Sequence, residues 1–135
     1  MSYLKPVPVP NQWTKPFWDA CNEKRLIAQR CDATGQIWFP PAPTSPNTRD
    51  NKWTWVDLSG KGKVASFVVM HQKYFPGYDD DMPYKVAEIE LEEGIILISN
   101  VVELGDRELE IGMEVEVVFE PAGDEFLLPK FRPVA

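Results

Sequence analysis

Residues 83–102, "PYKVAEIELEEGIILISNVV", decide the fold class of this 135-residue chain. Three apolar residues alternate there with three glutamates, in the order Ala87, Glu88, Ile89, Glu90, Leu91 and Glu92. A period of two places the apolar side chains on one face of an extended strand and the charges on the other. Gly94 then marks a turn, and the apolar run after it predicts a second, buried strand.

Similar patterns extend this β region from residue 58 to the C-terminus. Residues 113–120 alternate apolar residues with glutamates, and residues 63–71 and 125–134 also have the composition of strands. Five strands, with a short turn segment at 105–112 between the third and the fourth, predict a small closed Greek-key barrel of the OB-fold type. The long segment 72–83, between the first two strands, predicts a functional or mobile loop.

The N-terminal part predicts a Pro-punctuated arm and then a short helix from Thr14 to about Lys24. The Thr14 hydroxyl can cap the helix, Pro16 fits its first turn, and Asp19 lies near the positive end of its dipole. The apolar side of this helix can pack on its own chain or on a partner, and the sequence leaves both readings open.

A compact lobe is expected between the helix and the barrel, with strands at 25–31 and 52–60 on either side of a Pro-rich loop. The whole chain is therefore predicted to be mainly β. We expect an arm and helix at 1–24, the lobe at 25–56 and the OB-fold domain at 57–135.

The lobe contains the frame of two metal-binding knuckles, C-x-x-C-G and C-P-x-C, in "CDATGQIWFPPAPTSPNT", residues 31–48. The four ligand positions are occupied by Cys31, Thr34, Ser45 and Thr48. A structural zinc site needs about four Cys or His ligands, and neutral hydroxyls are poor replacements. We therefore predict that the lobe binds no zinc.

Prolines and aromatic side chains are expected to hold the lobe in place of the ion. Prolines lower the entropy of the unfolded loop, and large aromatic surfaces can pack a small lobe without a metal. The aromatic residues concerned are Trp38, Phe39, Trp53 and Trp55.

Composition and charge exclude several classes of function. The net charge of −7, from 14 basic and 21 acidic residues, opposes binding to nucleic acid, because few cations are available to neutralise phosphates. No apolar run approaches the roughly 18 residues of a membrane span. Two cysteines, Cys21 and Cys31, are expected to be free thiols, and no secretion signal is visible, so we expect a cytoplasmic protein.

No catalytic constellation is visible. His71 is the only histidine and lies at the end of a predicted strand, so a structural or partly exposed side chain is the expected reading. The acidic run 79–81 lacks the spacing of a calcium loop and is expected to be a solvated loop tip. Lys61 and Lys63, in a Gly-punctuated turn, are the candidates for contact with a phosphorylated ligand such as coenzyme A.

The order of several motifs resembles a known family. They are "FWDACNEKRLIAQRC", the "FPP" and "SPNT" of the knuckle frame, "WTWVDLSGKGKVASF", "PYKVAEIELEEGIILISNVV", "IGMEVEVVFE" and "LPKFRP". Together they resemble the acyl-CoA-associated OB-fold proteins with an N-terminal rubredoxin-like zinc ribbon, called domain of unknown function 35. The resemblance runs from about residue 15 to residue 133. The four cysteine places of that ribbon match Cys31, Thr34, Ser45 and Thr48, so three of them have departed from the family's pattern.

This resemblance implies a non-catalytic subunit that binds a thiolase-fold enzyme, or a related enzyme such as a MaoC-like hydratase, and helps to form the passage for the acyl-CoA. Neither cofactor nor metal is expected to bind stably, and acyl-CoA only within a complex. A homodimer stays an open alternative. Exposed aromatic residues are favoured interface anchors, and the candidates for partner contact are Trp18, Trp38, Phe39, Phe75 and Tyr78.

Two other hypotheses stay open at this point. One is a free-standing OB-fold module that binds single-stranded nucleic acid through its aromatic strands, against which the acidic balance counts. The other is a small enzyme that uses His71 and the aspartates, and it has the least support from the residues.

Overall fold

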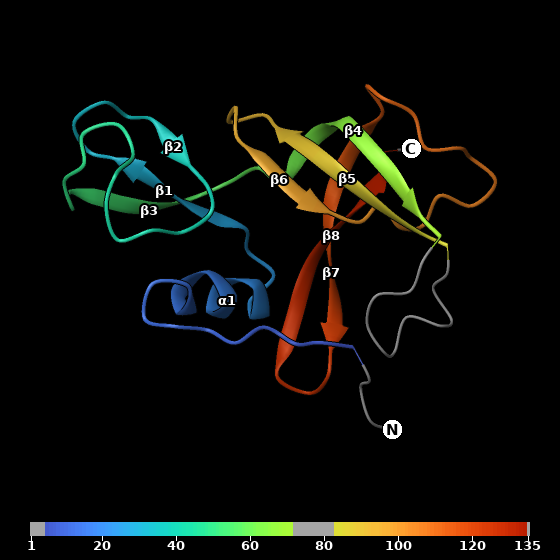
Figure 1. Cartoon of the computed structure of the whole chain (residues 1–135), viewed down its shortest axis with the longest axis horizontal. Coiled ribbons are helices and arrows are strands. Elements are labelled where there is room, and N and C mark those ends of the chain that lie inside the picture. The colour runs from blue at the N-terminus through green and yellow to red at the C-terminus, as the bar shows by residue number, and fades with distance from the viewer. Residues whose placement is uncertain (1–4, 72–82, 135) are drawn as a thin grey trace.

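The computed structural model describes residues 5–71 and 83–134 (Figure 1). One short helix precedes eight strands, which form two separate antiparallel sheets. The elements are α1 (Lys15–Asn22), β1 (Ile27–Cys31), β2 (Ile37–Trp38), β3 (Trp53–Asp57), β4 (Lys61–Met70), β5 (Tyr84–Leu91), β6 (Ile96–Ser99), β7 (Glu114–Ala122) and β8 (Phe126–Pro133). The prediction of a mainly β chain with one N-terminal helix is confirmed.

Helix α1 begins where it was predicted to begin, but without the predicted side-chain cap. Pro16 lies in the first turn as expected, whereas the Thr14 hydroxyl makes no capping hydrogen bond to the helix. Instead, the Asn11 carboxamide accepts hydrogen bonds from the backbone N–H groups of Trp13 and Thr14, at 2.8 and 3.0 Å. The prediction of a Thr14 cap is therefore wrong, because the turn before the helix uses the side chain three residues earlier.

The lobe sheet has the strand order β2-β1-β3. Gln29 in β1 pairs with Trp38 on one side and with Trp55 on the other, so the central strand carries both neighbours. The two outer strands were expected only in part. Strand β2 lies in the Pro-rich segment. It is only two residues long, which is too short to show an alternation of apolar and polar residues in the sequence.

The second sheet has the topology of an OB-fold. Its order is β6-β5-β4-β7-β8, so the first strand of the barrel, β4, lies in the centre and pairs with β5 and β7. A parallel bridge between Val101, just after β6, and Phe131 in β8 joins the two edges of the curled sheet. The predicted five-stranded OB-fold is confirmed.

Strand β4 bends and so pairs with both β5 and β7. A register shift between Val64 and Ser66 interrupts its pairing with β5 and lets the strand turn. Gly62 lies so close to β5 that a Cβ atom there would stand 2.5 Å from the backbone oxygen of Glu90. A side chain at this position would therefore separate the two strands.

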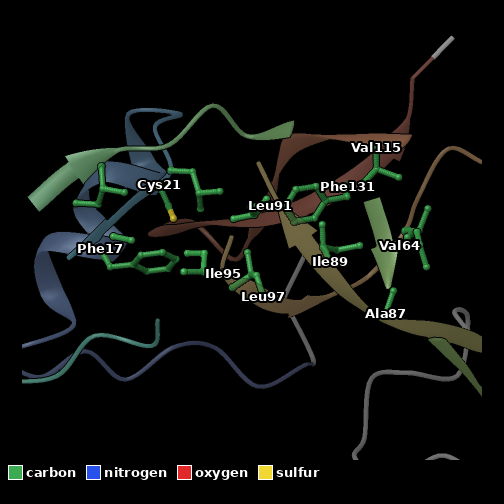
Figure 2. Close-up of a cluster of buried hydrophobic side chains, with 14 of the residues drawn as sticks. Phe17, Cys21, Val64, Ala87, Ile89, Leu91, Ile95, Leu97, Val115 and Phe131 are labelled. Atoms are coloured by element: carbon green, nitrogen blue, oxygen red, sulfur yellow. The ribbon is translucent and has the colours of Figure 1, made fainter. Parts of the chain in front are cut away.

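One buried hydrophobic cluster joins the helix, the lobe and the barrel (Figure 2). Figure 2 shows Phe17 and Cys21 of α1 at one end of the cluster, Val64 and Val115 at the other, and Phe131 between them. Leu26, Ile27 and Ala28, at the start of the lobe, belong to the same cluster. The three predicted segments therefore share one core.

The helix is fixed to the barrel by a polar contact as well. The carboxamide of Asn22 donates to the backbone oxygen of Glu125 and accepts from the backbone N–H of Leu127, both at 2.9 Å. These atoms belong to the β7–β8 hairpin, which reaches down beside α1 in Figure 1.

No helix in the described part of the chain is long and apolar enough to cross a membrane.

Two isoleucines on adjacent strands test which face of the barrel supports the fold. Ile89 is fully buried, whereas Ile98 is 68% exposed. We expect Ile89→Ala to lower the free energy of unfolding by about 2–5 kcal/mol, because it leaves a cavity in the shared core. The matched change Ile98→Ala should alter it by less than about 0.5 kcal/mol. Denaturant unfolding of both variants measures the difference, and equal effects would contradict the assigned register.

Candidate functional site

The knuckle lobe contains two turns with the same hydrogen-bond pattern. In the first, the N–H of Gly35 donates to the carbonyl of Cys31, and in the second the N–H of Arg49 donates to that of Ser45, both at 2.8 Å. Gly35 and Arg49 both have a positive φ, of 75° and 61°. The first residue of each turn also donates its own N–H to the carbonyl five positions later, at 2.8 Å. The two knuckles predicted from the sequence frame are therefore both formed.

The side chains at the other three predicted ligand positions surround the sulfur of Cys31. Cys31 and Ser45 are fully buried, and Thr34 and Thr48 lie at the surface. The hydroxyls of Ser45 and Thr34 form hydrogen bonds with the thiol, and the Thr48 hydroxyl oxygen lies 3.8 Å from Sγ. We call these four residues the knuckle cluster.

Hydrogen bonds lower the pKa of Cys31 to about 6 from its ordinary value of 9.0. The Ser45 hydroxyl makes the largest contribution, followed by the hydroxyl and the backbone N–H of Thr34, while burial opposes them and the N–H of Ala33 adds to them. The other cysteine behaves in the opposite way, since burial in the apolar core raises the pKa of Cys21 to about 12. The two thiols are chemically distinct.

A buried glutamine and three tryptophans hold the Pro-rich loop onto the lobe sheet. Gln29, 1% exposed, donates to the carbonyl of Ala42 at 2.6 Å and accepts from its N–H at 2.7 Å. The indole of Trp53 donates to the carbonyl of Pro43 at 3.0 Å and has edge contacts with the rings of Trp38 and Trp55. Aromatic packing was predicted, whereas the role of Gln29 was not, because a glutamine in a strand carries no local signal of burial.

The knuckle cluster does not have the donor set of a zinc site. One thiol and three neutral hydroxyls supply at most one of the roughly four thiolate or imidazole ligands that structural zinc requires. In the described ranges 5–71 and 83–134, no three His, Cys, Asp or Glu side chains form a group able to hold a metal ion. The residues that are present therefore do not fit the ion.

Lys61 and Lys63, the candidates for phosphate contact, line an open groove of about 630 Å³ over β4. In the sheet, Lys61 is the cross-strand partner of Glu116, and Lys63 is the partner of both Glu90 and Glu114. Glu92 also lines the groove, so four carboxylates accompany the two ammonium groups. Such a balance of charge disfavours an anionic ligand there.

The aromatic candidates for partner contact were expected among the more exposed side chains, and of those that the structure describes only Trp38 is buried. Trp38 is 8% exposed and packs in the lobe. Trp18 and Phe39 are half-buried, and both contact the ring of Phe17, at centroid distances of 5.0 and 5.3 Å. Trp18 and Phe39 therefore pack against the shared core with part of their surface exposed. A role in partner contact stays a prediction for all three.

The remaining candidates divide between the exposed surface and the undescribed segment. His71 is exposed at the end of β4, in agreement with a surface histidine. Phe75, Tyr78 and the acidic run 79–81 lie outside the described residues. Large apolar side chains are exposed elsewhere, notably Ile96, Ile98 and Ile111. The run after Gly94 was predicted to be a buried strand, and this is wrong for Ile96 and Ile98, because the side chains of β6 alternate between the core and the surface.

Two family profiles match this chain in the order of its two sheets. One, described as the ChsH2 rubredoxin-like zinc ribbon domain, matches residues 18–44, and the other, described as the ChsH2 C-terminal OB-fold domain, matches residues 55–120. A DUF35 domain-containing scaffold protein of Methanocaldococcus jannaschii is 34% identical, over 81% of this chain and 82% of its own length. The chain belongs to the DUF35 family. The ribbon match ends at residue 44, directly before Ser45, where the second knuckle begins.

Other DUF35 relatives are parts of larger proteins or of enzyme assemblies. The chain is 37% identical to a probable enoyl-CoA hydratase alpha subunit of Thermomonospora curvata, over 96% of this chain but only 40% of that protein. A solved structure titled "Ltp2-ChsH2(DUF35) aldolase" has 36% identity and a TM-score of 0.85, over 96% of this chain and 100% of that chain. A DUF35 structure from Sulfolobus solfataricus, with 11% identity and a TM-score of 0.64, shares the fold.

The lowered pKa of Cys31 predicts a pH dependence of stability. A thiol whose pKa is about 6 in the folded chain and 9.0 when unfolded stabilises the fold fully above pH 9, and this contribution is lost as the pH falls through 6. We therefore expect stability to rise between pH 6 and pH 9 by more in the wild type than in Cys31→Ser. Denaturant unfolding at a series of pH values, with Cys21→Ser as the matched control, measures the difference. Identical profiles for the wild type and Cys31→Ser would contradict the assignment.

Proposed function

We propose that this DUF35 chain is a non-catalytic accessory subunit that binds an enzyme acting on acyl-CoA. The observation that carries the proposal is the likeness to the DUF35 chain of the aldolase structure, which covers that chain from end to end at 36% identity. Two chains of this similarity share their backbone arrangement, so they can be expected to use a related partner. The partner is then a separate protein with its own active site.

The names of the relatives favour a partner from acyl-CoA chemistry. Besides the aldolase, two relatives are named as alpha subunits of hydratases whose substrates are coenzyme A thioesters, and this chain spans 40% and 32% of their lengths. The archaeal relatives, which are covered over most of their length, are named scaffold proteins. We propose a thiolase-fold enzyme as the partner, with a MaoC-like hydratase as the alternative, and a role in forming the acyl-CoA passage.

The side chains of the described residues support a non-catalytic role. Cys31 has the lowered pKa of a nucleophile, but its side chain is fully buried, and a reactive thiolate must be accessible to its substrate. Cys21 is buried in apolar surroundings that raise its pKa. His71 is exposed at the end of a strand and does not line the groove over β4. These are the properties of structural residues.

Binding to nucleic acid is the less favoured alternative. The net charge is −7, and the groove over β4 brings four glutamates next to Lys61 and Lys63. A polyanion gains affinity mainly by releasing counterions to protein cations, and this surface offers an excess of anions.

Copurification tests the proposal directly. We expect the tagged chain, recovered at native levels from its own host, to elute with a second protein that has an acyl-CoA enzyme fold. Acyl-CoA turnover should require that partner and should be absent from the isolated chain. Mass spectrometry of the eluate and a turnover assay measure the two outcomes.

The controls separate the alternatives. Turnover by the isolated chain that is lost in His71→Ala would support an enzyme and overturn the accessory role. Micromolar, salt-dependent binding of an oligonucleotide would favour the nucleic-acid alternative. Elution of the chain by itself would also contradict the proposal.

A further inference from the structure

The two knuckles keep the backbone of a metal site although the donor set does not fit a metal. Each knuckle begins at a fully buried side chain, Cys31 or Ser45, and ends four residues later at a positive φ. Each also closes with the same two backbone hydrogen bonds, one to the fourth and one to the fifth residue after its start. The geometry has been maintained by something other than thiolate ligands.

Backbone N–H groups point at the first side chain of each knuckle. In the first, the N–H groups of Ala33 and Thr34 form hydrogen bonds with the sulfur of Cys31. In the second, the N–H of Asn47 donates to the hydroxyl oxygen of Ser45 at 3.3 Å. The equivalent atom is thus an acceptor in both knuckles, whether it is sulfur or oxygen.

Besides the hydrogen bond from the Asn47 carboxamide to that of Gln36, the side-chain contacts between the knuckles converge on one atom. The Ser45 hydroxyl, from the second knuckle, forms a hydrogen bond with the Cys31 sulfur, and the Thr48 hydroxyl approaches it to 3.8 Å. The Thr34 hydroxyl reaches the same sulfur from the first knuckle. The Cys31 sulfur therefore forms hydrogen bonds with side chains of both turns. It links the two turns as a metal ion would link four thiolates, but the central atom here is a hydrogen-bond acceptor and not a cation.

We propose that the knuckle cluster is a metal-independent core of the lobe, in which the Cys31 sulfur forms hydrogen bonds with the hydroxyls of Thr34, Ser45 and Thr48 and takes over the role of the ion. The lobe then needs no zinc to join its two knuckles. The backbone of each knuckle remains arranged for a thiolate ligand. This inference does not depend on the proposed function, because it concerns the lobe of the isolated chain.

Removal of one donor tests the hydrogen-bonded core. Ser45→Ala keeps the backbone but removes the hydroxyl that links the knuckles, and we expect the melting temperature to fall by roughly 5 °C. Thr44→Ala is the matched control, because Thr44 is the exposed neighbour of Ser45, and it should shift the melting temperature by less than about 1 °C. Equal melting temperatures for Ser45→Ala and the wild type would overturn the proposal.

Elemental analysis of the full chain, expressed with added zinc, tests metal independence. The wild type should contain far less than one zinc per chain, and a chelator should leave its melting curve unchanged. One zinc per wild-type chain, or a lower melting temperature with the chelator, would overturn the proposal.

Conversion of the cluster tests whether the knuckles keep the geometry of a ligand site. The triple variant Thr34→Cys, Ser45→Cys and Thr48→Cys supplies four thiolates, and we expect it to bind one zinc and to melt at a lower temperature after chelation. A triple variant that folds without binding zinc, or that stays unfolded when zinc is present, would overturn the retained geometry.

Discussion

Phe131 is the residue on which the arrangement of the molecule depends. Its side chain is fully buried in the cluster shared by helix, lobe and barrel. Its backbone also closes the barrel, because its N–H donates to the carbonyl of Asn100 at 3.0 Å and its carbonyl accepts from Val102 at 2.7 Å. The same residue pairs with Val117 across the β7–β8 hairpin. Closure of the sheet and burial of the core therefore depend on the same residue.

The helix and the lobe depend on this closed barrel. Hairpin β7–β8 supplies both the surface on which α1 packs, through the ring contact of Trp18 with Phe126, and the backbone groups that bind Asn22. Leu26 connects the lobe in turn, since its carbonyl accepts a hydrogen bond from the N–H of Leu58, where the chain leaves the lobe for the barrel. An accessory subunit built in this way presents its lobe at a fixed position relative to the barrel.

The strands of the barrel could be predicted because their alternation is local. The glutamates between apolar residues in β5 show which face of the strand is exposed to solvent. The pairs β4–β5, β5–β6 and β7–β8 join strands that are consecutive in the chain, and the OB-fold topology adds the β4–β7 pair. Contacts made by long-range geometry were not visible in the same way. The clamp of Gln29 on Ala42 and the burial of Trp38 both depend on where a segment distant in the sequence lies. The knuckle cluster could also be predicted from a local pattern, because its four positions have the sequence spacing of two metal-binding knuckles.

Loss of the ion would change how the lobe is stabilised. In a small zinc domain, the four metal–ligand bonds supply much of the free energy of folding, and such domains fold by themselves when the metal is present. Here the equivalent contacts are the hydrogen bonds of Cys31, the clamp of Gln29 and the indole bond of Trp53. A hydrogen bond between neutral groups contributes about 0.5–1.5 kcal/mol. Contacts of this size do not stabilise about 30 residues without help. The burial of Ile27 and Ala28 in the shared core supplies that help, so the lobe is part of the cooperative unit of the barrel.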